Sequence, residues 1–155
     1  MPLVRGALDE AGAGDAQAVG RAAAVGSGVV NGLAVTPDGT AYLTDSVRAV
    51  VHRVTPQDLA AGSGSLTPVY DLTDRLTPVP GRVFSLNGIT SDPAGRYLLT
   101  VDMAAGDLHR IDLGTGGLSR VTLQGGDLTH ADDLDLTADG SLRAARPAPG
   151  GVDSF

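Results

Sequence analysis

Apolar and polar residues alternate along this chain in short segments that end at turn-forming residues. Val29–Thr36 is an apolar run closed by Pro37-Asp38-Gly39, and a second short segment, Ala41–Asp45, follows the turn. Gly, Pro and Asp separate neighbouring strands in this way. The other expected strands are Val50–Thr55, Thr67–Leu72, Phe84–Ser91, Arg96–Asp102, Leu108–Leu113, Leu118–Leu123 and Leu134–Leu136. The pattern predicts an all-β chain.

The order of these segments repeats. Asn31 opens the phrase Asn-Gly-Leu-Ala-Val-Thr-Pro-Asp-Gly, Asn87 opens Asn-Gly-Ile-Thr-Ser-Asp-Pro-Ala-Gly, and Asp132 opens Asp-Asp-Leu-Asp-Leu-Thr-Ala-Asp-Gly. The three phrases start 56 and then 45 residues apart. A period near 45 that contains four short strands is typical of a β-propeller blade.

Agreement between the first two copies extends past the opening strand. Tyr42-Leu43 matches Tyr97-Leu98, and Val51–Val54 matches Leu108–Ile111. The extra length of the first copy falls in two loops, 56–65 and 73–82. Insertions of this kind are expected in surface loops.

These blades give the chain three parts. Residues 29–142 are predicted to be a partial propeller of about two and a half four-stranded blades, which start near 29, 84 and 128. Residues 1–28 read as an atypical or disordered head. After Leu142 the sequence Arg-Ala-Ala-Arg-Pro-Ala-Pro-Gly-Gly predicts no central strand, so 143–155 is expected to be an irregular tail.

So few blades do not close a ring. Propellers typically join four to eight blades, and an open stack leaves strand edges and apolar faces uncovered. Three routes remain open: self-association that closes the propeller, a truncated product, and a chain that folds poorly alone.

Composition narrows the function classes. The net charge is −7, which argues against nucleic acid as a partner. The chain has no Cys, so thiolate chemistry is excluded, and cysteine usage gives no information about the redox environment of its compartment. No apolar run of about 18 residues predicts a membrane span, and the N-terminus has no signal-peptide pattern. The cellular location is therefore unknown.

The heads of the opening strands carry the candidate chemistry. In a propeller these strands line the central channel, so Asn31, Asn87 and Asp132 are expected to converge at its mouth. Their oxygens suit hard divalent cations such as Ca²⁺, Mg²⁺ or Mn²⁺. His130, two residues before Asp132, is expected at the rim of this site, in reach of a substrate. The alternative is structural, because Asn-Gly is also a common turn dipeptide.

For the other candidate residues a structural role is expected rather than a catalytic one. His52 and His109 occupy equivalent positions of the repeat, which indicates a role in the blades. Asp45 and Asp102 end strands, where carboxylates usually bind loop backbone. Phosphate-binding loops and the serine-hydrolase elbow are absent from the sequence.

Three phrases together resemble the senescence marker protein/gluconolactonase/luciferin-regenerating enzyme family. They are Val30–Ser46, Leu86–Ile89 and Leu108–Leu113, and the resemblance covers about residues 29–142. It implies a six-bladed propeller with one divalent metal on its axis, and the family includes calcium-dependent lactone hydrolases. Ca²⁺ is therefore the expected cofactor, with Mg²⁺, Mn²⁺ or Zn²⁺ as alternatives.

The resemblance also implies roles for three residues. Asn87 corresponds to a metal ligand, Asp132 to a metal ligand that also serves as general base, and Asn31 to a residue that contacts the substrate. The family's other ligand is a Glu from an early blade, but Glu10 is the only Glu here and lies too close to Asn31 to belong to that blade. The family usually has Gly where this chain has Asp133.

The leading functional hypothesis is a metal-dependent hydrolase of the lactonase type, or a truncated remnant of one, acting on a lactone or sugar-derived small molecule. The alternative is a non-catalytic propeller segment that binds a partner or serves as a scaffold. A third reading is an incomplete product without independent function.

Overall fold

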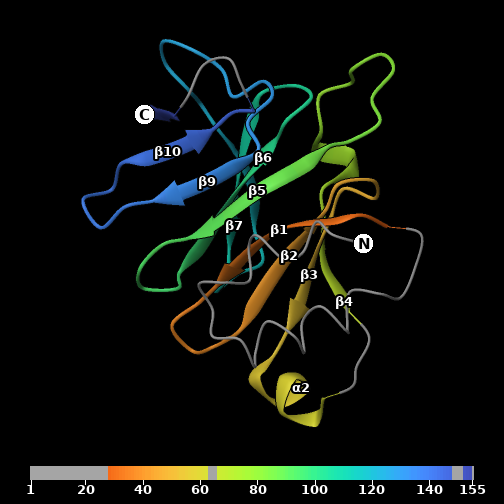
Figure 1. The fold of residues 1–155 in the computed structure, drawn as a ribbon, viewed down its shortest axis with the longest axis vertical. Coiled ribbons are helices and arrows are strands. Elements are labelled where there is room, and N and C mark those ends of the chain that lie inside the picture. The colour runs from red at the N-terminus through yellow and green to blue at the C-terminus, as the bar shows by residue number, and fades with distance from the viewer. Residues whose placement is uncertain (1–27, 63–65, 148–151, 155) are drawn as a thin grey trace.

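The computed structural model describes residues 28–62, 66–147 and 152–154, and in that range the chain is nearly all β (Figure 1). Two four-stranded antiparallel sheets have the meander orders β1-β2-β3-β4 and β5-β6-β7-β8, and a third has the order β11-β10-β9. The predicted β-propeller blades are therefore confirmed. The predicted head, 1–28, lies outside the described residues except for Gly28.

The strand bounds follow the predicted segments closely. The first sheet contains β1 (Val30–Val35), β2 (Ala41–Asp45), β3 (Val50–Val54) and β4 (Thr67–Asp71). The second contains β5 (Leu86–Ser91), β6 (Tyr97–Asp102), β7 (Asp107–Asp112) and β8 (Leu118–Val121). The third contains β9 (Asp133–Leu136), β10 (Leu142–Ala145) and β11 (Val152–Ser154).

Two short helical turns occupy the loops of the first blade. The helix α2 (Pro56–Ala61) begins at Thr55, whose hydroxyl accepts from the N–H of Asp58 while the Asp58 carboxylate accepts from the N–H of Thr55. This reciprocal cap and the proline in the first turn explain why a helix forms there. The 3₁₀ turn η1 (Thr73–Arg75) lies in the second inserted loop. No helix in the described part of the chain is long and apolar enough to cross a membrane.

The three sheets pack face to face in chain order. One apolar cluster joins the first two sheets through residues such as Tyr42, Val51 and Ile89. A second cluster joins the second and third sheets through Leu99, Leu128 and Leu134. Each such leucine contributes on the order of 1.5–3 kcal/mol when it is fully buried. This packing brings β1, β5 and β9, the opening strands of the three blades, side by side (Figure 1).

The expectation of an irregular tail directly after Leu142 is wrong. β10 spans Leu142–Ala145 and is the central strand of its sheet, paired with β9 on one side and β11 on the other. Ala144 is fully buried opposite Leu134, whereas Arg143 faces water. The segment alternates correctly for a half-buried strand, but the buried position after Leu142 holds small Ala144, which carries a weak strand signal.

The register also corrects one sequence match. Tyr42 pairs with Ala34, and Leu99 pairs with Thr90, so Tyr42 corresponds to Leu99 and not to Tyr97. The turn of the second copy is one residue longer, because Asp92 bonds Tyr97 where Thr36 bonds Thr40. The match of His52 with His109 is confirmed, since both lie opposite corresponding positions of the preceding strand.

Candidate metal and substrate site

Each of the first two opening strands contains an irregularity at its Asn-Gly. The register of β1 against β2 shifts between Val30 and Leu33, and that of β5 against β6 shifts between Leu86 and Ile89. Asn31 and Asn87 lie within these shifts. A bulge re-aims the side chain it contains, which accounts for the position of both asparagines at the cavity. β9 pairs with β10 without such a shift, and Asp132 precedes it directly.

Asn87 lies at the centre of the site. Its side chain is buried, with 2% of the residue exposed. Nδ2 donates to Oδ1 of Asp132 at 2.8 Å and contacts Sδ of Met103 at 3.2 Å. The backbone carbonyl of Asn87 accepts from the Thr44 hydroxyl at 2.6 Å. Contacts from the first blade, the third blade and its own blade therefore hold this one residue.

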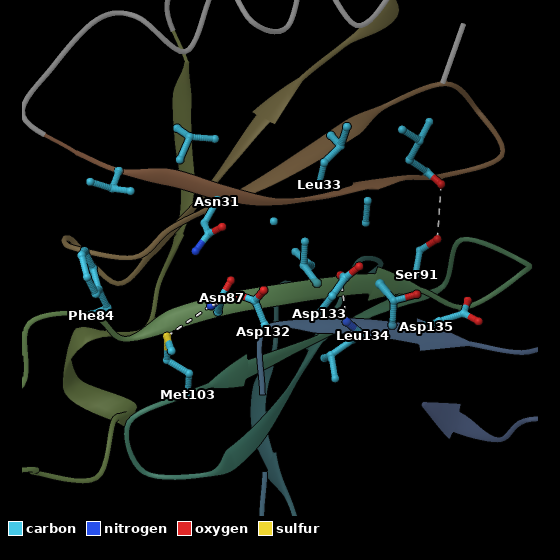
Figure 2. Close-up of a pocket in the computed structure, with 17 residues that line it drawn as sticks. Asn31, Leu33, Phe84, Asn87, Ser91, Met103, Asp132, Asp133, Leu134 and Asp135 are labelled. Carbon is cyan, nitrogen blue, oxygen red and sulfur yellow. Dashed lines mark hydrogen bonds between the residues drawn. The ribbon is translucent and has the colours of Figure 1, made fainter. Parts of the chain in front are cut away.

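Asn31 faces the same space from β1. Its Nδ2 donates to the Ser46 hydroxyl at 3.3 Å, and that hydroxyl donates to the Leu86 carbonyl at 2.6 Å. Figure 2 shows the Asn31 amide pointing from β1 toward Asn87 and Asp132. Asn31 is exposed and does not bond directly to either residue.

One cavity of about 1070 Å³ joins the three predicted residues. Its walls come from β1, β5 and β9, with Phe84 and Met103 at one end and Asp133 and Asp135 toward the other (Figure 2). The repeat thus predicted correctly that the heads of the opening strands meet in one place. The chemical roles assigned to Asn31, Asn87 and Asp132 stay predictions.

His130 does not share this arrangement. Its side chain is exposed, and it is not among the residues that line the cavity. Its backbone has a positive φ of 66° and donates to the Met103 carbonyl at 2.8 Å. The local turn therefore accounts for the position of His130, and its predicted contact with substrate gains no support from the geometry.

Met103 is a cavity residue that the sequence analysis missed. It follows the strand-end residue Asp102, as Ser46 follows Asp45. In each of the first two blades this position touches the asparagine at the head of the opening strand, through Ser46–Asn31 and Met103–Asn87. An alignment that used the observed register would have identified Met103.

The strand-end carboxylates serve structure, as predicted. Asp45 is fully buried, and its Oδ1 accepts from the N–H groups of Val29, Val47 and Arg48. Burial by itself would raise the pKa of Asp45, but these bonds and the Arg48 guanidinium, 2.6 Å away, hold it below the usual value. Asp102 is likewise buried, and Arg82 donates to both its oxygens at 2.8 Å.

The two equivalent histidines are also buried in the blades. Burial lowers the pKa of His52 and of His109. The nearby carboxylates Asp45 and Asp107 oppose this effect at His52 and His109 respectively. Neither histidine lines the cavity.

The side chains in the cavity that could bind a metal ion are mainly amides and carboxylates, which offer oxygen ligands. Asn87 and Asp132 are in contact, and Asp133 and Asp135 lie farther along β9. Over residues 28–62, 66–147 and 152–154, no group of three or more His, Cys, Asp or Glu side chains has an arrangement that would hold a metal ion. Any cation here would have two adjoining protein ligands, one amide and one carboxylate.

No family model matches the sequence, and no curated protein matches it. Solved structures do match the fold. Virginiamycin B lyase from Staphylococcus aureus has a TM-score of 0.53 at 20% identity, over 81% of this chain and 40% of its own. Regucalcin from Agrobacterium tumefaciens, described as a calcium-binding protein, has a TM-score of 0.52 at 21% identity, over 76% of this chain and 37% of its own.

A luciferin-regenerating enzyme has a TM-score of 0.54 at 16% identity, again over 76% of this chain and 37% of its own. At such identities the likeness establishes the fold and leaves the activity open. The chain therefore has the blade architecture of a β-propeller, and it spans 40% or less of each of these structures.

Proposed function

We propose that this chain is a metal-dependent hydrolase of the lactonase type, in which Asn87 and Asp132 hold a divalent cation, with Ca²⁺ the first candidate. The observation that carries the proposal is the contact of these two side chains, 2.8 Å apart, on the wall of a large cavity. Support comes from the resemblance to the gluconolactonase family and from the likeness in fold to a calcium-binding regucalcin.

The residues present fit a hard cation. No hydrogen bond among the described residues ends on Oδ1 of Asn87 or on Oδ2 of Asp132. Amide and carboxylate oxygens are the ligands that Ca²⁺ prefers, and Ca²⁺ takes six to eight of them. Two protein oxygens leave most of its coordination to water and to substrate.

A bound cation would act as a Lewis acid on the carbonyl oxygen of a lactone. The protein's own part is proton transfer at Asp132. The Asp132 carboxylate accepts a proton from a water molecule as the water oxygen attacks the carbonyl carbon. When the ring C–O bond breaks, the same carboxyl returns the proton to the departing alkoxide, so that the product is the open hydroxy acid.

The remaining cavity residues position the substrate. Asn31 presents an amide from the opposite wall, suited to the hydroxyl or carbonyl groups of a sugar-derived ring (Figure 2). Its bond to Ser46 fixes the direction of that amide. Phe84, 45% exposed and on the cavity wall, offers an apolar face for the carbon skeleton.

The alternative is a propeller segment that binds without catalysis. It is favoured by the direction of the Asn87–Asp132 bond, because an amide that donates to a carboxylate joins the two side chains without a metal. In that case Asn87 and Asp132 join the second and third blades and have no chemical role.

Hydrolysis of a panel of sugar-derived lactones separates the two functions. Proton release would be followed with added Ca²⁺ and after chelation, for the natural chain, for Asp132→Asn and for Asp74→Asn. Asp74 is exposed, so its variant removes the same charge outside the cavity. Chelation and Asp132→Asn should each lower the rate by about 100-fold or more, as loss of a general base typically does. The binding alternative would be supported if the natural chain gave only the buffer rate. It would also be supported if Asp132→Asn hydrolysed the lactones as fast as the natural chain.

A further inference from the structure

The two interfaces between sheets use corresponding positions. In the first sheet the positions that face the next sheet are Gly32 and Ala34 on β1 and Tyr42 and Thr44 on β2. In the second sheet the corresponding positions are Gly88, Thr90, Leu99 and Val101. The same side of each of the first two sheets therefore packs against the next sheet. None of these eight positions carries a charge.

Sterics explain why glycine occupies the first of these positions in both sheets. A Cβ on Gly32 would lie 2.5 Å from the backbone oxygen of Asn87, on the next sheet's opening strand. A Cβ on Gly88 would lie 2.8 Å from backbone atoms of Asp133. In both interfaces the backbone of the next opening strand comes so close that no side chain fits.

The third sheet breaks this pattern at three of the four positions. Asp133 stands where the other sheets have glycine, and Asp135 stands where they have Ala34 and Thr90. Arg143 replaces Tyr42 and Leu99. All three are exposed, whereas their neighbours Leu134, Leu142 and Ala144 are buried against the second sheet.

Burial along the second strands gives the same result. Every residue of β2 is buried, and so are five of the six in β6, because sheets or loops cover both faces. In β10 the pattern alternates between buried and exposed. Alternation is typical of a sheet with one face in water.

We infer that the outward face of β9 and β10, with Asp133, Asp135 and Arg143, is not an interface between copies of this chain and stays in contact with water. If the sheet of a second copy packed here as the sheets pack in the two observed interfaces, its opening strand would clash with Asp133, and charged side chains would be buried. We therefore expect no head-to-tail association of two copies through this face. This inference does not depend on the proposed function.

Thiol labelling tests it directly, because the chain contains no cysteine. Arg143→Cys places one thiol on the outward face, and Leu99→Cys places one at the corresponding buried position of the second sheet. Each labelling rate would be measured without metal over a wide range of protein concentration and compared with the same variant in denaturant. Circular dichroism would establish that each variant is folded. Ala144→Cys, on the inward side of β10, replaces Leu99→Cys if that variant fails to fold.

The Arg143→Cys thiol should react within about tenfold of its denatured rate at every concentration, because it needs no opening of the fold. The Leu99→Cys thiol should react at least about 100-fold more slowly than in denaturant, because its reaction requires local opening of the fold. Protection of the Arg143→Cys thiol to the level of Leu99→Cys, at any concentration at which the protein is folded, would overturn the inference.

Discussion

Asn87 and Asp132, 45 residues apart, meet through an Nδ2–H···Oδ1 hydrogen bond of 2.8 Å. They occupy the same position in successive copies of the repeat, at the heads of β5 and β9. The register of each blade therefore decides whether the site forms.

Gly88→Ala should destabilise the interface between the second and third sheets. The added Cβ would lie 2.8 Å from the Asp133 backbone, and overpacking of this kind costs about 1–3 kcal/mol. Urea unfolding followed by circular dichroism measures the loss. Gly114→Ala is the matched control, since its Cβ would lie 3.4 Å from Asp112 Oδ1, and it should cost less than about 0.5 kcal/mol. Equal effects of the two variants would contradict the close approach of β5 and β9.

The free energy of unfolding should decrease as pH falls below neutrality. Burial lowers the pKa of His52 and His109 below the ordinary value of 6.5. Below pH 6.5 the unfolded chain therefore binds more protons than the folded chain. The stability that comes from neutral histidine is present above pH 6.5, and it is lost as pH falls through the pKa values of the two histidines in the folded chain. Urea midpoints at pH 7.5 and pH 5.5 measure this slope.

The double variant His52→Gln/His109→Gln should show a flatter slope between those two pH values. Exposed His130 provides the control, and His130→Asn keeps a residue that tolerates the positive φ. That variant should retain the slope of the natural chain. A slope that survived the double variant would assign the pH dependence to other groups.

Asn87→Asp should place two carboxylates in contact and make stability depend on pH and on metal. Like charges raise the pKa of such a pair, so the destabilisation caused by the pair is smallest at low pH and grows as pH rises through the raised value. At pH 7 we expect a loss of about 1–3 kcal/mol, which added Ca²⁺ should reverse. Asn31→Asp, exposed and bonded to Ser46, should lose less. Thermal unfolding with and without Ca²⁺ compares the two, and equal losses would contradict the central position of Asn87.

The sequence predicted the strands well where both faces of a sheet are covered. The strand Tyr97–Asp102 is mostly apolar, and the predicted segment Arg96–Asp102 matched its bounds within a residue. β10 was missed because its second buried position holds alanine, Ala144, and its exposed position holds Arg143. One face of that sheet is in water, so only half of the usual signal is present.

The candidate site was predictable only to the level of the repeat. Equivalent positions at the heads of three strands predicted the convergence of Asn31, Asn87 and Asp132. The contact of Met103 with Asn87 depends on a register that a longer second turn shifts by one residue. The placement of His130 outside the cavity depends on a local positive φ. Neither feature has a signal in residue type alone.

The most direct test of the account is Ca²⁺ binding to the natural chain, to Asp132→Asn and to Asp74→Asn, measured by isothermal titration calorimetry. We predict one saturable site per natural chain, unchanged affinity in Asp74→Asn, and a loss of at least tenfold, about 1.4 kcal/mol, in Asp132→Asn. The absence of saturable binding by the folded natural chain, or equal affinity in Asp132→Asn, would contradict a metal site at Asn87 and Asp132.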